Sequence, residues 1–172
     1  NDASPGHYVP NSNMTYEIPC SLGTYQPNTG QSSCDQADPG FHVPNSESLD
    51  QTPCDVGTYQ NASGQSSCHP TPIGHYNNLT GSTSPIPCSP GYFQSSEGQA
   101  DCITSQAGYY VPSEGQSAQT ICEAGTFQPG TGMTLCWRAN LGNYVSQEGA
   151  TQQTDCQPGT YADVRGLVEC KE

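Results

Sequence analysis

The chain has 172 residues, of which 31% are hydrophobic, and it contains 19 Gly and 15 Pro but only 3 Phe and 1 Trp. So few large apolar side chains cannot fill one large hydrophobic core. The formal net charge is −13, and the cations are Arg138, Arg165 and Lys171. This charge excludes nucleic acid and anionic membranes as partners, because both bind basic surfaces. The acidity fits either ordinary solubility or loose binding of divalent cations between chains.

Ten cysteines compensate for the missing core. Among small, polar, turn-forming residues they indicate many small units, each held by a disulfide, and persistent disulfides require an oxidising compartment. Sequons for N-glycosylation at Asn13, Asn61 and Asn78 point the same way, so we expect an extracellular or cell-surface glycoprotein. No apolar run approaches the ~18 residues that span a bilayer. The chain begins at Asn1 without a signal peptide, so we expect a mature product or a piece of something longer.

The cysteines define a tandem repeat. A short interval, such as Cys20 to Cys34, alternates without exception with a long interval, such as Cys34 to Cys54, and together they make a 34-residue period. The cysteines are Cys20, Cys34, Cys54, Cys68, Cys88, Cys102, Cys122, Cys136, Cys156 and Cys170. We therefore predict five repeats, at residues 4–37, 38–71, 72–105, 106–139 and 140–172.

A finer, 17-residue period divides each repeat into two half-repeats, each with a first glycine. The first glycines are Gly6, Gly23, Gly40, Gly57, Gly74, Gly91, Gly108, Gly125, Gly142 and Gly159. An aromatic residue follows two positions later, except at His42, where Phe41 stands beside it. A second glycine follows seven positions after the first, and only Asn13 and Glu47 replace it. Asn is the next-best residue for positive φ, so we expect a left-handed turn there.

In chain order, each repeat begins with a half that lacks cysteine, such as residues 6–19, and continues with a half such as residues 20–34 that has a cysteine at each end. Pro or Gly interrupts every few residues and no helical periodicity is sustained, so each half should form two or three short strands joined by tight turns. With one aromatic residue per half-repeat, neighbours must stack, and the tyrosines should form a discontinuous spine. The predicted fold class is small disulfide-rich β, an elongated solenoid-like array of short strands and turns with almost no helix.

Two disulfide pairings respect the period. Links across the long intervals would leave Cys20 and Cys170 without partners, whereas links across the short intervals use all ten cysteines. We prefer the second pairing, which closes each bridge inside one half-repeat and stabilises by roughly 3 kcal/mol per loop in the chain-entropy model. Halves without a bridge should then be held by stacking between bridged neighbours.

Residues that could carry chemistry are few. His7 and His75 occupy equivalent positions and His42 and His69 do not, and we interpret all four as surface residues rather than metal ligands or general bases. The cysteine spacing is unlike that of a zinc site, and no G-x-S-x-G motif is present. We therefore expect no catalytic residues, no metal and no cofactor beyond covalent N-glycans, with O-glycans on Ser and Thr compatible with the composition. Trp137 fits a contact between chains or packing on the adjacent bridge.

The run C-x-x-G-T-Y-Q-x-x-x-G-Q-S-S-C at residues 20–34 and 54–68 resembles the ephrin-receptor-like cysteine-rich repeat, which is distantly akin to EGF-like and tumour-necrosis-factor-receptor-like modules. The resemblance extends over all five repeats and is weakest at residues 156–170. In the family, cysteines usually occur in most half-units, whereas here alternate halves have none. The resemblance implies extracellular stalk or ectodomain architecture more than an activity.

Two functions remain open. The first is a structural extracellular glycoprotein, a rod or fibre subunit that assembles with copies of itself. The second is a ligand-binding or adhesive ectodomain of a cell-surface receptor. Regularity favours the first, because a binding site normally interrupts a repeat with an insertion or a unique patch, and the cysteine spacing is never interrupted. We expect a homopolymer or filament whose contacts lie at the first and last repeats.

Overall fold

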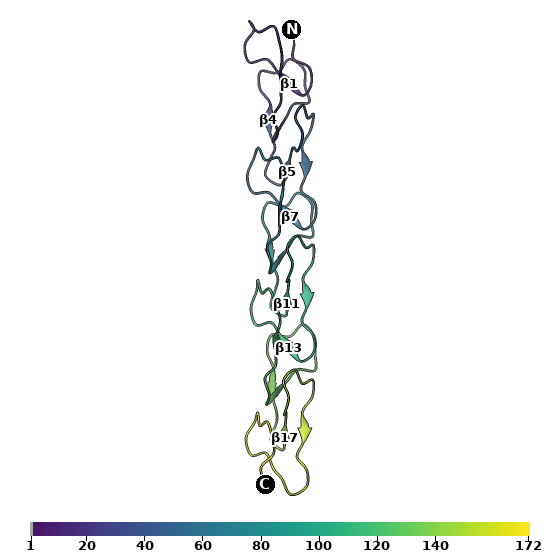
Figure 1. Cartoon of the computed structure of the whole chain (residues 1–172), viewed down its shortest axis with the longest axis vertical. Helices are drawn as coiled ribbons and strands as arrows, with labels where there is room; N and C mark the ends of the chain where they lie inside the picture. Colours follow the sequence, from purple (N-terminus) through teal and green to yellow (C-terminus); the bar gives the residue numbers. More distant parts are fainter. Residues whose placement is uncertain (1) are drawn as a thin grey trace. The chain divides into compact units, whose positions relative to one another are not determined.

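The computed structural model describes residues 2–172, which form short antiparallel strand pairs joined by turns and contain no helix (Figure 1). Within that range there is thus no helix long and apolar enough to cross a membrane. Contacts divide the chain into two compact units. The first comprises Asn1–Pro72, Tyr76–Ile86 and Glu97–Asp101. The second comprises Ile73–His75, Pro87–Ser96 and Cys102–Glu172.

Four strand pairs lie in the first unit, one in each half-repeat, and every strand has two residues. They are β1 (His7–Tyr8) with β2 (Ile18–Pro19), β3 (Thr24–Tyr25) with β4 (Asp35–Gln36), β5 (Phe41–His42) with β6 (Thr52–Pro53), and β7 (Thr58–Tyr59) with β8 (His69–Pro70). The first strand of each pair contains the position of the repeated aromatic residue. The prediction of two or three short strands per half-repeat is therefore confirmed in this unit.

Four more pairs lie in the second unit. They are β11 (Tyr92–Phe93) with β12 (Ile103–Thr104), β13 (Tyr109–Tyr110) with β14 (Thr120–Ile121), β15 (Thr126–Phe127) with β16 (Trp137–Arg138), and β17 (Asn143–Tyr144) with β18 (Thr154–Asp155). Two further strands, β9 (His75–Tyr76) and β10 (Ile86–Pro87), contain residues of both units. The same strand pair thus recurs, and the small disulfide-rich β class predicted from the sequence is confirmed.

A glycine turn introduces the first strand of each pair. At Gly23, φ is 81°, and the Thr24 N–H donates to the Ser21 carbonyl at 3.0 Å, the arrangement of a type II turn with glycine at its third position. A side chain has no room there, because a Cβ on Gly23 would lie 2.0 Å from the carbonyl oxygen of Gly64. Gly64 is the second glycine of the half-repeat two further along the chain. Glycine is therefore required both for its φ and for this close backbone contact.

Backbone hydrogen bonds join each half-repeat to the next. The Gly40 N–H donates to the Gln60 carbonyl at 2.7 Å, and the Val43 N–H donates to the Gln65 carbonyl at 3.0 Å. In a third bond, the N–H of the second glycine of the following half-repeat donates to a backbone carbonyl of the preceding one. All three recur with the half-repeat period within each unit. Stacking of half-repeats thus depends on backbone hydrogen bonds. Half-repeats with very different side chains can therefore stack in the same way.

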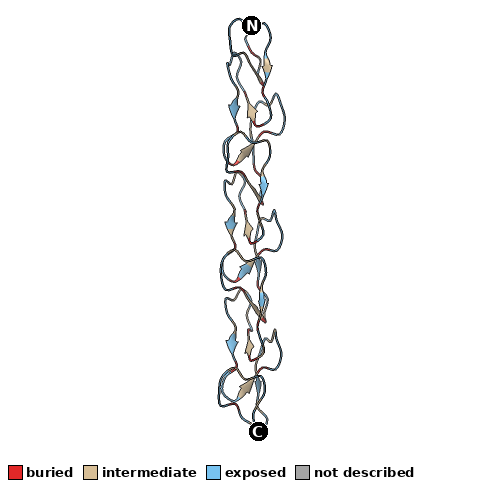
Figure 2. Cartoon of the chain, turned by 60° about the vertical axis from the view of Figure 1, so that its left-hand side comes forward, coloured by how far each residue is buried: buried red, intermediate tan, exposed pale blue. Residues whose placement is uncertain are grey.

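The core consists of the first glycines from Gly6 to Gly125 and of most residues three positions before and three positions after a first glycine. The residues before are Ala3, Cys20, Ala37, Cys54, Thr71, Cys88, Ser105, Cys122 and Ala139, and those after are Gln26, Val43, Gln60, Asn77, Gln94, Val111, Gln128, Val145 and Ala162. Figure 2 shows these buried residues as short stretches between strands of intermediate or exposed residues. No described aromatic side chain is fully buried, so the expected tyrosine spine is wrong. The close backbone contacts leave interior space only for small side chains and for glutamine.

Glutamine belongs in this core because its own loop satisfies its amide group. Gln60 is 1% exposed, and its Nε2 donates to the Ser67 carbonyl at 2.8 Å while its Oε1 accepts the Ala62 N–H at 3.1 Å. Gln26 and Gln128 make the same two kinds of bond. Each glutamine therefore braces the loop that the adjacent disulfide closes.

The left-handed turn expected at the position of the second glycine occurs at all eight second glycines and at one of the two positions where another residue replaces it. Glu47 has φ of 59° and is the one described non-glycine residue with positive φ. Asn13 is not in this conformation, so the expectation is wrong there. The carbonyl of Glu47 lies against Gly6, as the second glycines lie against first glycines elsewhere, and this contact forces the backbone of Glu47 into the left-handed region.

Candidate functional site

Five disulfides close alternate half-repeats, each joining the residue three positions before the first glycine to the residue eleven positions after it. They are Cys20–Cys34, Cys54–Cys68, Cys88–Cys102, Cys122–Cys136 and Cys156–Cys170. This is the pairing across the short intervals that we preferred from the sequence. No described cysteine is free. The chain therefore presents closed loops rather than a set of thiol ligands.

Glutamine or glutamate takes the place of the bridge in four of the five half-repeats that lack cysteine, and Pro85 stands at the equivalent position of the fifth. The Oε1 atom of Gln51 accepts the Asp38 N–H at 2.6 Å, and its Nε2 donates to Oδ2 of Asp38 at 2.7 Å. The same backbone bond is made by Glu17, Gln119 and Gln153. This clamp was not predicted from the sequence, from which we expected stacking alone to hold these halves. The available signal was that Glu17, Gln51, Gln119 and Gln153 follow the 34-residue period.

Glu17 is the charged member of this set. The Ser4 N–H donates to its Oε2 at 2.7 Å, and the Ser4 hydroxyl donates to both carboxylate oxygens. These bonds favour the ionised form, so they hold the pKa of Glu17 below its ordinary value, the backbone bond contributing most. The clamp in the first half-repeat therefore depends on the ionisation of its own glutamate, whereas a glutamine side chain has no group that ionises.

The four histidines lie in different surroundings. His7 and His75 are equivalent, and in each Nδ1 lies near a carbonyl two residues earlier. His69 packs on Tyr59 with ring centroids 5.8 Å apart. His42 is different, because its Nδ1 lies 3.3 Å from Sγ of Cys68.

His42, Cys54 and Cys68 are also the described residues whose ligand atoms lie close enough together to share a metal ion, within 4.8 Å of one another. The two sulfur atoms are bonded to each other in this structure, so they are not free thiolate ligands.

Trp137 marks a patch that no other described half-repeat contains. It pairs with Phe127 across β15 and β16, with ring centroids 5.9 Å apart and planes at 86°, yet 48% of Trp137 is exposed. A shallow hollow beside it is lined by Phe127, Leu135, Cys136, Trp137, Arg138, Asn140 and Arg165. Trp137 therefore packs next to the Cys122–Cys136 bridge and also remains accessible to a partner.

This hollow gathers two of the three cations of the chain. Both Arg138 and Arg165 are exposed, and the stem of Arg138 lies against Gly166. The third cation, Lys171, forms an ion pair with Asp163 at 2.7 Å, which lowers the pKa of Asp163 and raises that of Lys171. No ion pair engages either arginine within residues 2–172. The Trp137 patch can thus accept carboxylates or other anions, which sequence analysis did not recognise.

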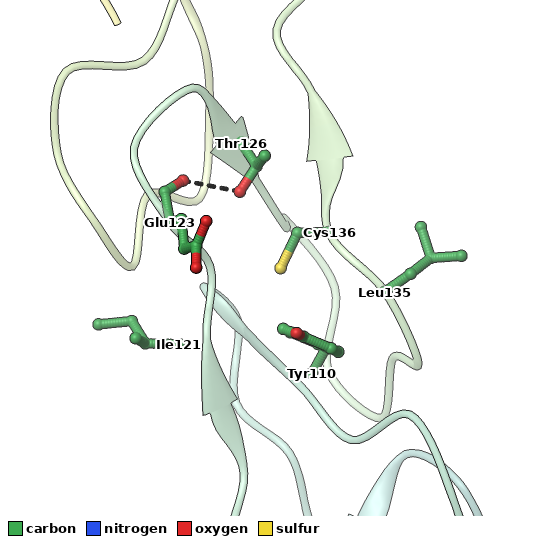
Figure 3. A pocket seen from close by; sticks show the side chains of 6 residues that line it. All are labelled: Tyr110, Ile121, Glu123, Thr126, Leu135 and Cys136. Atoms are coloured by element: carbon green, nitrogen blue, oxygen red, sulfur yellow. Dashed lines mark hydrogen bonds between the residues drawn. The ribbon is translucent and has the colours of Figure 1, made fainter. Parts of the chain in front are cut away.

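A second hollow shows how aromatic residues cover the bridges. It is lined by Tyr110, Ile121, Glu123, Thr126, Leu135 and Cys136, and Figure 3 shows the ring of Tyr110 facing the sulfur of Cys136. The Thr126 hydroxyl closes the adjacent turn by donating to the Glu123 carbonyl at 2.7 Å (Figure 3). Nothing in this hollow resembles a nucleophile with its base, so its role is packing.

The predicted glycosylation sites are all accessible. Asn13, Asn61 and Asn78 are exposed and lie in or beside turns. A large hydrated glycan could be attached at each without displacing a packed side chain.

Comparison with known families supports the resemblance seen in the sequence. The model of the family described as tyrosine-protein kinase ephrin type A/B receptor-like matches residues 45–86, which include the Cys54–Cys68 half-repeat. No curated protein matches the chain. The match concerns a cysteine-rich extracellular module that is not itself catalytic. Together with the five disulfides, it points to an extracellular or secreted protein.

Proposed function

We propose that this chain is a structural subunit of an extracellular fibre, which assembles from copies of the chain through stacked cysteine-rich repeats. The observation that carries the proposal is the recurrence of the same backbone hydrogen bonds between neighbouring half-repeats at every 17-residue step within each unit. No insertion interrupts this pattern. Such a backbone suits a role that depends on length and resistance to proteolysis rather than on one localised site.

Any half-repeat that ends such an array leaves a stacking surface without a partner. At Gly125, a Cβ would meet the Gly166 carbonyl oxygen at 2.3 Å, whereas nothing lies within 4 Å of the same position at Gly142. The Gly142 turn has the same conformation, with φ of 78°, so it is already shaped for the contact. A further half-repeat, in the same chain or in another copy, could supply it, and where copies make this head-to-tail contact they propagate into a filament unless the rotation closes a ring.

Charge distribution supports the same head-to-tail orientation. The first unit contains no Lys or Arg, and Asp35, Asp38 and Asp50 gather around Tyr25, whose pKa is raised by burial and then by these carboxylates. All three cations belong to the second unit. Attraction between the Trp137 patch of one copy and carboxylates in the first unit of another would offset part of the repulsion from the −13 charge. Screening at physiological salt limits that repulsion to a range of about 8 Å.

The proposed fibre is a glycoprotein without enzymatic activity or bound cofactor. N-glycans on Asn13, Asn61 and Asn78 would keep it hydrated and protect its loops from proteases. Intact-mass analysis before and after enzymatic removal of N-glycans tests these three sites. An unchanged mass would contradict them.

A receptor ectodomain is the second candidate, and the Trp137 patch favours it because it is a unique patch on a regular repeat. Thr120 and Thr154 occupy the position of Trp137 in the two neighbouring half-repeats, so Trp137→Thr removes the patch with a residue that this fold already accepts. In an ectodomain, this variant would lose binding to cells that bear the ligand while it remains folded.

Electron microscopy of the native material separates the two candidates. A fibre subunit should be found in filaments that an antibody against the chain decorates at regular intervals. An ectodomain should be dispersed over the cell surface, with no filament labelled.

A further inference from the structure

One of the five disulfides has a histidine beside it. The Nδ1 atom of His42 lies 3.3 Å from Sγ of Cys68, and both sulfur atoms of the Cys54–Cys68 bridge lie within 4.8 Å of a ring nitrogen of His42. Cys54 is fully buried, whereas Cys68 is partly exposed. A thiol from solution would therefore reach the sulfur of Cys68 first.

His42 stands at a position where the equivalent half-repeats have tyrosine, so a histidine at this position lies beside one bridge. His42 stands two residues after Gly40, where the other half-repeats without cysteine have Tyr8, Tyr76, Tyr110 and Tyr144. Figure 3 shows the tyrosine version, in which Tyr110 faces Cys136. A phenol with an ordinary pKa of about 10 is a weak proton donor near neutral pH, whereas an imidazole can be protonated there. The same fold thus contains one bridge with a proton donor and acceptor beside it, and close equivalents that have tyrosine there.

We propose that Cys54–Cys68 is a thiol-exchange site whose reactants are small-molecule thiols such as reduced glutathione, and that His42 promotes the exchange. This inference does not depend on the fibre proposal. It gives His42 a role that its interpretation as a surface residue did not include.

The exchange proceeds in two displacements. A thiolate attacks Sγ of Cys68, a mixed disulfide forms between the thiol and Cys68, the bond between the two cysteines breaks, and Cys54 leaves as a thiolate. A second thiolate then attacks the small-molecule sulfur of the mixed disulfide and releases Cys68 as a thiolate. The two thiol molecules are oxidised to their disulfide, and the protein disulfide is reduced to two thiols by the same two electrons.

His42 lies where each displacement needs a positive charge or a proton donor. The sulfur of Cys54 leaves within 4.8 Å of the ring in the first step, and the sulfur of Cys68 leaves 3.3 Å from Nδ1 in the second. A protonated imidazole stabilises a departing thiolate and can donate its proton to it, and a better-stabilised leaving group departs faster. We therefore expect Cys54–Cys68 to open on the order of tenfold faster than the bridges covered by tyrosine.

The test is partial reduction of the whole oxidised chain by reduced glutathione, with samples alkylated over time and mapped by mass spectrometry. Pepsin should replace trypsin, because no Lys or Arg precedes Arg138. The reference bridges are Cys20–Cys34, Cys88–Cys102 and Cys122–Cys136. Cys156–Cys170 is left out of the comparison, because both of its cysteines are partly exposed.

Two variants separate the effect of His42 from local differences in packing. His42→Tyr installs the residue of the equivalent positions and should slow the opening of Cys54–Cys68 to the rate of the reference bridges. Tyr110→His should speed the opening of Cys122–Cys136 by a similar factor. Equal rates for all reference bridges and Cys54–Cys68 in the unmodified chain would overturn the proposal, as would a Tyr110→His variant whose Cys122–Cys136 bridge opens no faster.

Discussion

Single glycines carry much of the specificity of this fold, because from Gly6 to Gly125 each first glycine lies against the backbone of a half-repeat further along the chain. Gly57 and Gly142 share φ of 78°, but a Cβ on Gly57 would lie 2.2 Å from the Gly98 carbonyl oxygen, while nothing lies within 4 Å at Gly142. The pair therefore separates the cost of a left-handed conformation from the cost of a steric clash.

We predict that Gly57→Ala destabilises the folded chain by about 3 kcal/mol or more, because strain in φ and overpacking add. Gly142→Ala should cost only about 1 kcal/mol, which is the conformational part. Amide hydrogen exchange on either side of each substitution, with disulfides intact, measures both effects. Similar losses of protection in the two variants would show that the contact with Gly98 contributes nothing.

The carboxylate of Glu17 provides a test at the same scale. Its folded-state pKa lies below the ordinary value of 4.5, so its clamp adds stability above the unfolded-state pKa and loses it as the pH falls through the lower folded-state pKa. Ser4→Ala removes the hydroxyl donor but keeps the backbone N–H, so the pKa of Glu17 should rise only part of the way. Titration of the Glu17 carboxyl by NMR measures the shift.

Glu17→Gln is the matched control for that titration, since glutamine forms the same clamp at residues 51, 119 and 153. The variant should keep the protection of the Ser4 amide while losing its dependence on pH in the acid range. A carboxyl of Glu17 that titrates at its ordinary value would contradict the clamp.

At the scale of the element, the ends of the half-repeat are joined in two ways. A disulfide joins them in the half-repeats with cysteine, and a glutamine or glutamate bonded to backbone joins them in four of the five half-repeats without cysteine. Both versions use the residue eleven positions after the first glycine, and the clamp ends at the residue that follows the position of the first cysteine, so one version should convert into the other.

We predict that Ala37→Cys with Gln51→Cys forms a sixth disulfide, because these residues correspond to Cys54 and Cys68 in the next half-repeat. The new loop should stabilise by about 3 kcal/mol. Non-reducing peptide mapping identifies the bond, and denaturant unfolding measures the gain. Two free thiols at residues 37 and 51 under conditions that oxidise the native pairs would show that the halves are not equivalent.

Much of this element could be predicted from the sequence, because cysteine and glycine have strict geometric requirements. The spacing of cysteines led to the observed bridges, and the glycine period led to the turns. The core could not be predicted, because the decisive contacts are made by backbone. Val43, Gln60 and Asn77 occupy one core position, and nothing in their chemistry suggests a shared role. The loop of Gln60 satisfies its amide, whereas Nδ2 of Asn77 donates to the Thr58 carbonyl and Oδ1 of Asn77 has no hydrogen-bond partner among the described residues. The tyrosines, in contrast, are of a residue type that is expected in a core, but they lie beside it.

The candidate sites divide in the same way, into those that residue type reveals and those that only the folded structure reveals. The asparagine sequons and Trp137 were identified because each depends on residue type alone. His42 and the two arginines beside Trp137 were missed as candidate functional residues, because the case for them comes from neighbours that are distant in the chain. Cys68 is such a neighbour for His42, and Arg165 is one for Arg138. Contacts between residues so far apart in the chain leave no local pattern in the sequence.

At the scale of the whole molecule, the central claim is that copies of the chain join into a fibre. Sedimentation velocity of the glycosylated, oxidised chain at micromolar concentration and physiological salt tests it most directly. The account predicts species larger than the monomer, whose proportion grows with protein concentration and which persist when Trp137 is replaced by threonine if stacking of half-repeats is the main contact. A single monomeric species at every concentration, in a sample with its glycans and disulfides intact, would contradict the fibre and favour the receptor ectodomain.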